Sequence, residues 1–128
     1  MTTWIEIADR FARVLETGDA AELERLYHPR LLFTVRTVGT VHDRDGALAT
    51  FRSIWPLLHD VRVEIVDRQA TTSGFLSQQV LHATGPDGTR VAVPMCLVFG
   101  LRDGLVDRID EYFDPATVGP VLDAVSVG

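Results

Sequence analysis

The stretch from Phe75 to Phe113 reads FLSQQVLHATGPDGTRVAVPMCLVFGLRDGLVDRIDEYF and carries the pattern that decides the fold. It consists of three runs rich in β-branched and apolar residues, separated by a Gly-Pro-Asp-Gly sequence and an Arg-Asp-Gly sequence. Glycine and proline at such points favour tight turns, and runs of this composition favour strands. The stretch therefore predicts two consecutive antiparallel hairpins, with strands at Phe75–Ala83, Val91–Leu101 and Leu105–Phe113.

Two more strands are predicted upstream of this stretch. In residues 61–65, valine and isoleucine alternate with charged residues, which is the period of a strand with one buried face. Residues 31–38 are rich in β-branched and apolar residues and predict an earlier strand. A polar loop through Gly39, His42 and Asp43 is expected to follow it.

Two capping patterns predict the first two helices. A Thr-x-x-Glu sequence at 3–6 precedes apolar residues at helical spacing, which predicts a helix running to about Gly18. An Asp-x-x-Glu sequence at 19–22 begins a second helix, which Pro29 is expected to end near His28. The two helices are then joined by a single tight corner.

A third helix and a short terminal helix complete the prediction. The third is closed by Pro56, and its apolar positions recur at three- and four-residue spacing: Ala47, Leu48, Phe51, Ile54 and Trp55. Asp114 and Pro115 are typical of the N-cap and first position of a helix. Because the strands are segregated from the helices, residues 1–128 are expected to form one α+β domain. Its long antiparallel sheet should curl around the helices and leave a pocket between them.

The composition excludes several classes of protein. Apolar residues make up 46% and charged residues 23%, which is typical of a globular domain. No apolar run approaches the roughly 20 residues that cross a bilayer, and no basic-then-apolar leader is present, so we expect a cytoplasmic protein without membrane contact. The net charge is −6, and the basic residues are scattered arginines, so no nucleic-acid partner is expected.

The sequence also predicts that no cofactor or metal is bound. Lysine is absent, which excludes Schiff-base chemistry, and no glycine-rich phosphate loop is present. Cys96 is the single cysteine and cannot form an internal disulfide. The four histidines lack nearby partners at metal-ligand spacing.

Four segments resemble the SnoaL-like polyketide cyclase group: FARVLETGD (11–19), LYHP (26–29), LHDVRVE (58–64) and VFGLRDGLVDRIDEYF (98–113). The similarity covers about Ile5 to Asp114. It implies the nuclear transport factor 2-like fold, a cone in which a curved, mostly antiparallel sheet wraps around the N-terminal helices and encloses a pocket. The same superfamily contains limonene epoxide hydrolases and ketosteroid isomerases, and one scaffold carries these different reactions.

The resemblance transfers few of the known catalytic groups. Where ketosteroid isomerases have a tyrosine, a base aspartate and a second aspartate, this chain has Phe11, Thr34 or Val35, and Cys96. An isomerase of that type is therefore not expected.

In the epoxide hydrolases, the positions of the catalytic Arg and of one Asp correspond approximately to Gln78 and Val80 here. The positions of the Tyr and the Asn that hold the water correspond approximately to Phe33 and Val35. The second Asp corresponds to Glu111, which keeps the carboxylate. SnoaL-type cyclases also use an acidic base, and Glu111 is the best candidate for it.

Because alternate residues of a strand share a face, Glu111 lies on the same face as Ile109 and Phe113. The resemblance implies that this face points towards the pocket. Desolvation there would raise the pKa of the carboxyl group from about 4.3 and make a useful base. The alternative is a solvated strand residue or one paired with an arginine. On the neighbouring strand, Gln78, Val80 and His82 share a face that the same alignment turns inward.

His82 would then serve as acid or oxyanion donor and Gln78 would orient ligand or water, unless His82 is simply exposed beside its turn. The complete predicted site has Glu111, His82 and Gln78 as catalytic residues. Its expected ligand-binding wall is Phe11, Val35, Trp55, Val80, Cys96, Val98, Ile109 and Phe113.

The resulting hypothesis is a SnoaL-like enzyme that needs no cofactor and applies acid/base chemistry to a small hydrophobic substrate, as a cyclase, isomerase or epoxide hydrolase. The alternatives are a non-catalytic small-molecule binding domain of the same fold and a protein-interaction module with a filled core. A homodimer is also expected, through an outer sheet face to which Gln79, Leu81, Leu97 and Phe99 are assigned.

Overall fold

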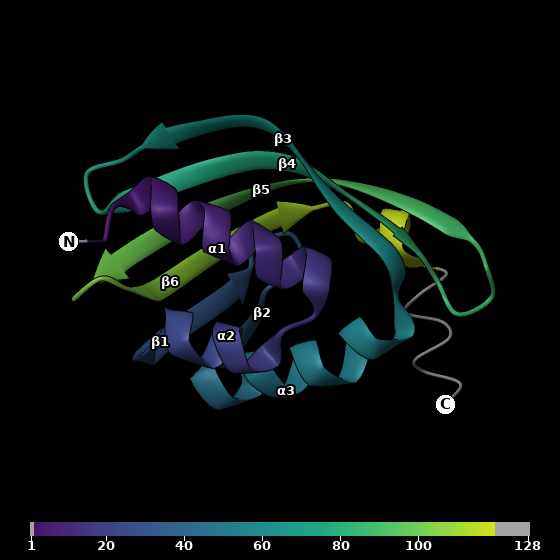
Figure 1. Ribbon diagram of the computed structural model, residues 1–128, viewed down its shortest axis with the longest axis horizontal. Coiled ribbons are helices and arrows are strands. Elements are labelled where there is room, and N and C mark those ends of the chain that lie inside the picture. The colour runs from purple at the N-terminus through teal and green to yellow at the C-terminus, as the bar shows by residue number, and fades with distance from the viewer. Residues whose placement is uncertain (1, 120–128) are drawn as a thin grey trace.

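The computed structural model describes residues 2–119, and these form three α-helices, two 3₁₀ turns and a six-stranded sheet (Figure 1). In chain order the elements are α1 (Trp4–Thr17), α2 (Ala20–Leu26), β1 (Tyr27–Val35), β2 (Thr40–Asp43), α3 (Arg44–Ile54), η1 (Trp55–Leu57), β3 (His59–Ala70), β4 (Gly74–Thr84), β5 (Arg90–Arg102), β6 (Leu105–Phe113) and η2 (Pro115–Val118). The strand order is β2-β1-β6-β5-β4-β3. All neighbours are antiparallel except β1 and β6, which are parallel. The predicted α+β class and the mostly antiparallel sheet are confirmed.

The helix ends follow the capping signals in the sequence. Thr3 and Glu6 form a complete capping box at the start of α1. Gly18 ends this helix in a left-handed conformation, with φ of 72°, which glycine adopts without the steric cost that a Cβ atom brings. The Asp19 side chain then accepts a hydrogen bond from the backbone N–H of Glu22. Together these contacts fix the corner between α1 and α2.

Two boundaries in the first half of the chain differ from the prediction. Helix α2 ends at Leu26, and Pro29 lies inside β1 rather than after a helix. The register of β1 against β6 shifts between Tyr27 and Leu32, so the proline, which has no N–H to donate, lies where the ladder is interrupted. The segment predicted as a polar loop contains β2, whose residue His42 pairs with Phe33 of β1.

The sheet curves over α1, while α2 and α3 lie below β1 and β2 (Figure 1). The hydrophobic core lies between these layers. One stack of rings crosses it: Trp4 contacts Phe75, Phe75 contacts Phe99, and Phe99 meets Phe11 edge-on. The ring centroids are 4.3–5.5 Å apart, which is the range of favourable aromatic pairs. This stack joins α1 to the sheet at one end of the cone.

The prediction of which residues of β4 and β5 face the helices is wrong. The residues assigned to the outer sheet face are buried on the concave face, with exposed fractions of 4% for Gln79, 6% for Leu81, 2% for Leu97 and 1% for Phe99. The register explains this result, because Glu111 pairs with Leu97, and Leu97 in turn pairs with Ser77. Directly paired residues share a face. The odd-numbered residues of these strands therefore face the helices.

Within residues 2–119, no helix is long and apolar enough to cross a membrane.

Candidate active site

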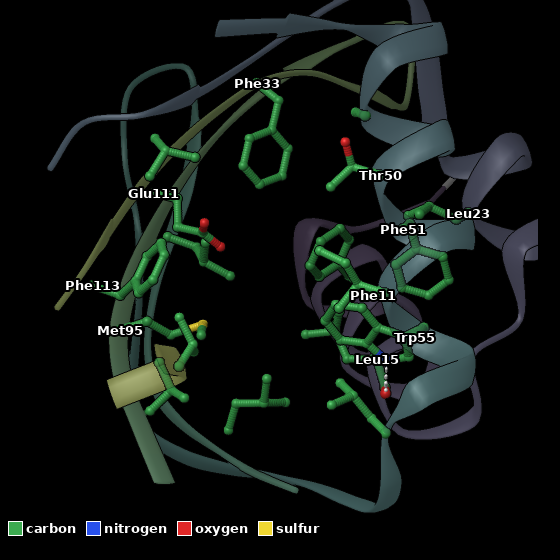
Figure 2. A pocket seen from close by; sticks show the side chains of 18 of the residues that line it. Phe11, Leu15, Leu23, Phe33, Thr50, Phe51, Trp55, Met95, Glu111 and Phe113 are labelled. Carbon is green, nitrogen blue, oxygen red and sulfur yellow. Dashed lines mark hydrogen bonds between the residues drawn. The ribbon is translucent and has the colours of Figure 1, made fainter. Parts of the chain in front are cut away.

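A cavity of about 230 Å³ opens between the concave side of the sheet and the three helices. Its lining is almost entirely apolar and includes six aromatic side chains, which are Phe11, Tyr27, Phe33, Phe51, Trp55 and Phe113. The sheet side contributes Glu111, Phe113 and Met95, and the helical side faces them across the open space (Figure 2). The domain therefore encloses an apolar cavity, whose volume lies somewhat below the roughly 300 Å³ at which small-molecule pockets usually begin.

Glu111 lies on β6 with its carboxylate directed into the cavity (Figure 2). Its neighbours in the sheet are Val35 on one side and Leu97 on the other. Ile109 and Phe113 share its face along the strand. Removal from water disfavours the charged form, and burial raises the pKa of the Glu111 carboxyl group to about 7. A group with this pKa can both accept and release a proton near neutral pH.

Tyr27, at the start of β1, also lines the cavity. The side chain is buried, and its pKa is raised by burial and by the nearby negative charge of Glu111. The hydroxyl therefore stays protonated and can donate a hydrogen bond to a ligand. Tyr27 was not expected at the site, because it falls in the segment predicted to be the end of the second helix.

Two further polar groups line the cavity. His42 is on β2, next to Phe33 in the adjacent strand, and Thr50 is on α3. His42 was expected in a loop, because the four residues of β2 carry no strand pattern of their own. Together with Glu111 and Tyr27, they are the polar side chains among the described residues that line the cavity. These lining residues include neither arginine nor cysteine.

The helical wall is fixed by the ring of Trp55. Its Nε1 atom donates a hydrogen bond of 2.6 Å to the carbonyl oxygen of Leu15 in α1. The ring also stacks on Phe51 of α3, with centroids 4.6 Å apart and an interplanar angle of 20°. These two contacts connect α1 to α3 along one wall of the cavity.

The structure brings together part of the predicted site. Glu111, Phe11, Val35, Trp55 and Phe113 line the cavity. Ile109 is fully buried beside Phe99 and belongs to the core rather than to the lining.

The other predicted site residues lie on the convex face of the sheet, namely Gln78, Val80, His82, Cys96 and Val98. Their partners explain this placement, since Cys96 pairs with Tyr112 and Val98 pairs with Asp110, which alternate with Glu111. His82 is held there by Glu64, with 2.9 Å between Nε2 and Oε1. The structure therefore does not place Gln78 and His82 in the pocket, where they were expected.

No cluster of three or more metal-binding side chains occurs in the part of the chain that the structure describes.

Comparisons with known proteins agree with this fold. The model of the SnoaL-like domain family matches residues 8–115. Curated proteins give no significant match. A protein from Shewanella denitrificans OS-217, described as a candidate SnoaL-like polyketide cyclase, superimposes with a TM-score of 0.80 at 14% identity, over 94% of this chain and 97% of that chain.

Two other solved structures represent different branches of the same fold. An LEH-like epoxide hydrolase from M. tuberculosis gives a TM-score of 0.76 at 18% identity, over 97% of this chain and 92% of that chain. A protein with a ketosteroid isomerase-like fold from Catenulispora acidiphila DSM 44928, in complex with trimethylamine, gives 0.77 at 16% identity, over 88% of both chains. The predicted nuclear transport factor 2-like fold is confirmed, and because the family model matches most of the chain, this protein belongs to the SnoaL-like domain family.

Proposed function

We propose that the cavity is the active site of an enzyme that works without a cofactor, and that Glu111 transfers a proton on a small hydrophobic substrate. The observation that carries the proposal is a carboxyl group with a pKa of about 7 directed into an apolar cavity. General acid–base groups act best when their pKa lies near the working pH. The family and its neighbours include cyclases and epoxide hydrolases, and proton transfer is common to these reactions.

Tyr27 is the natural partner of Glu111 in such a step. When the Glu111 carboxylate takes a proton from a substrate C–H or O–H group, negative charge develops on a substrate oxygen. Tyr27 lines the same cavity, and its hydroxyl group would donate a hydrogen bond to that oxygen. Returning the proton from Glu111 to another atom of the substrate completes an isomerisation or a ring closure.

The cavity volume limits the substrate. A dry cavity of about 150 Å³ holds benzene, and this cavity of about 230 Å³ is half as large again. A substrate with one ring or a short chain fits this space. The apolar lining selects a largely hydrocarbon body with few oxygen atoms.

The pH dependence of turnover tests the proposal once a screen of small polyketide-like, epoxide and cyclic ketone compounds has found a substrate. If Glu111 acts as the base, its deprotonated form is required, so kcat/KM should rise about tenfold per pH unit below pH 7 and level off above it. The measurement is a series of initial rates from pH 5 to 9 on a substrate that does not titrate. A flat profile over this range would contradict a base with this pKa.

A second candidate function is a non-catalytic binding domain that uses the same cavity. The observation that favours it is the small number of polar groups in the lining, since Gln78 and His82 lie on the other side of the sheet. The Catenulispora relative is in complex with a small molecule, trimethylamine. A ligand that binds at micromolar concentration and is recovered unchanged after long incubation would favour this function.

We also propose a homodimer formed through the convex face of the sheet, with the residues of that face corrected. The helices cover the concave side, whereas the convex side of β4, β5 and β6 carries apolar side chains at Leu76, Val80, Cys96, Val98 and Tyr112. An uncovered sheet face of this kind favours self-association.

Light scattering at micromolar concentration should therefore report about twice 14.2 kDa. Val98→Glu would place a charge at the centre of this face and should shift the protein to a monomer. Ala21→Glu, on the exposed side of α2, is the control and should remain a dimer. A wild-type monomer under these conditions would refute the dimer.

We place the protein in the cytoplasm. Cys96 is a free thiol, and it stays reduced most readily in a reducing compartment. A fusion to a fluorescent protein would report the location directly.

A further inference from the structure

We propose that the cavity binds small hydrophobic ammonium ions, with the Glu111 carboxylate as the counter-charge and the surrounding aromatic rings as the cage. The proposal rests on the binding role of the same cavity but requires no turnover. It assigns the pocket a class of ligand that the acid–base proposal does not include.

The first argument is charge. Glu111 is the one acidic side chain among the described lining residues, and these include neither arginine nor lysine. Burial is the cause of its raised pKa, and no neighbouring positive charge lowers it. A buried carboxylate without a partner is costly, and a cation in the cavity would supply the missing partner. The net charge of −6 adds a weak attraction for cations over the whole molecule.

The second argument is the aromatic lining. Phe113 lies two residues along the strand from Glu111, and Phe33 extends into the cavity from β1 (Figure 2). On the opposite wall stand Phe11 and the stacked pair of Phe51 and Trp55 (Figure 2). The electron-rich faces of such rings attract cations within about 6 Å, and the attraction is strongest where water is excluded. A lining with one carboxylate and several aromatic rings therefore suits an ammonium ligand better than it suits a neutral hydrocarbon ligand.

The third argument concerns the type of cation. A primary amine or a guanidinium group needs three or more hydrogen-bond acceptors when it leaves water. The lining offers few acceptors, because apart from Glu111 its polar side chains are Tyr27, His42 and Thr50. A quaternary or tertiary ammonium group has at most one N–H group, and alkyl groups surround its charged nitrogen. Such a cation can therefore pack against an apolar wall. The volume of about 230 Å³ accepts an ion of the size of choline.

The test compares two probes of the same shape. Choline carries the charge, whereas 3,3-dimethyl-1-butanol has a carbon atom in place of the nitrogen. Calorimetric titration of the purified protein at pH 8 should show choline binding tighter than the alcohol by about tenfold or more. Glu111→Gln keeps the size of the side chain and removes its charge, and the two probes should then bind with similar affinity. Thermal unfolding of the variant confirms that it is folded.

The pH dependence identifies the group responsible. Choline does not titrate, so its affinity should rise between pH 5.5 and 8.5 as Glu111 loses its proton. The other titratable side chains of the lining are His42 on β2 and Tyr27 on β1. The His42→Asn variant should retain this pH dependence, and Glu111→Gln should abolish it.

Equal binding of both probes by the wild type, or no binding of choline at millimolar concentration, would overturn the proposal. Unchanged choline binding in Glu111→Gln would overturn it too. These outcomes leave the acid–base proposal standing if turnover still follows the expected pH profile. Conversely, choline binding that depends on Glu111 supports the ammonium site even if no substrate is ever turned over.

Discussion

Replacing Glu111 with glutamine should lower turnover by about 100-fold or more, the usual size of a general-base effect. Glutamine keeps the shape of the side chain and its hydrogen-bonding capacity but cannot accept the proton. Binding of a neutral substrate should change far less, since the apolar walls of the cavity remain. The measurement is kcat and KM for wild type and variant on a substrate from the screen.

The same variant should be more stable than the wild type at alkaline pH. The pKa of Glu111 is about 7 in the folded protein and 4.5 as the ordinary value, so the folded state holds its proton more tightly than the unfolded state. The wild type therefore loses stability as pH rises from about 4.5 to 7, by up to about 3 kcal/mol. Glutamine has no proton to lose and avoids this cost. Thermal midpoints at pH 5 and pH 8 should converge for the variant.

Glu64→Gln is the matched control. Glu64 is an exposed carboxylate on β3, outside the cavity, and its hydrogen bond to His82 can be kept by the amide oxygen. Its turnover should stay within about twofold of the wild type. If Glu111→Gln behaves in the same way as this control, Glu111 is a structural residue and the base lies elsewhere or the protein is a binding domain.

Replacing Phe99 with alanine should reduce the free energy of unfolding by about 3 to 5 kcal/mol. The ring is buried between Phe11 and Phe75, so its removal leaves a void where helix α1 meets the sheet. A loss of this size is a large part of the total stability of a typical domain, about 5–15 kcal/mol. Urea unfolding followed by circular dichroism measures it.

Leu32→Ala provides the comparison, because this leucine on β1 is 54% exposed and should cost less than about 1 kcal/mol. The pair of variants also tests the corrected parity of β5. If Phe99 were on the convex face, as the sequence indicated, both substitutions would have similar small effects.

Local signals in the sequence were sufficient for most of the fold. Caps at Thr3 and Asp19 marked the helix starts, and the turns after β4 and β5 marked the hairpins. Each of these features depends on residues that are close in the chain. Strand β2 was missed because its four residues are specified by pairing with β1 and not by their own composition.

The parity of β4 could not be read from the sequence because each face of the strand mixes apolar and polar residues. Ser77 and Gln79 are buried, and the Ser77 hydroxyl donates a 3.0 Å hydrogen bond to Gln79 Oε1. Leu76 and Val80 are apolar residues on the convex face, whereas Phe75, Leu81 and Ala83 lie on the buried face, so alternation alone does not decide between the two faces. The alignment with the resembling families turned the wrong face of β4 inward, and this misplaced Gln78 and His82. Glu111 was placed in the pocket because the resemblance to a known family fixed the face of β6 independently.

The parallel pairing of β1 with β6 also determines when the cavity can form. The strand that carries Tyr27 and Val35 leaves the ribosome early, whereas the strand that carries Glu111 is the last of the strands within residues 2–119 to be made. Contacts between such distant segments form slowly, because a long loop must close before they stabilise the chain. A nascent chain that has already built α1 to β5 therefore still has an open wall where β6 belongs. Glu111 therefore enters the protein together with the strand that closes the cavity.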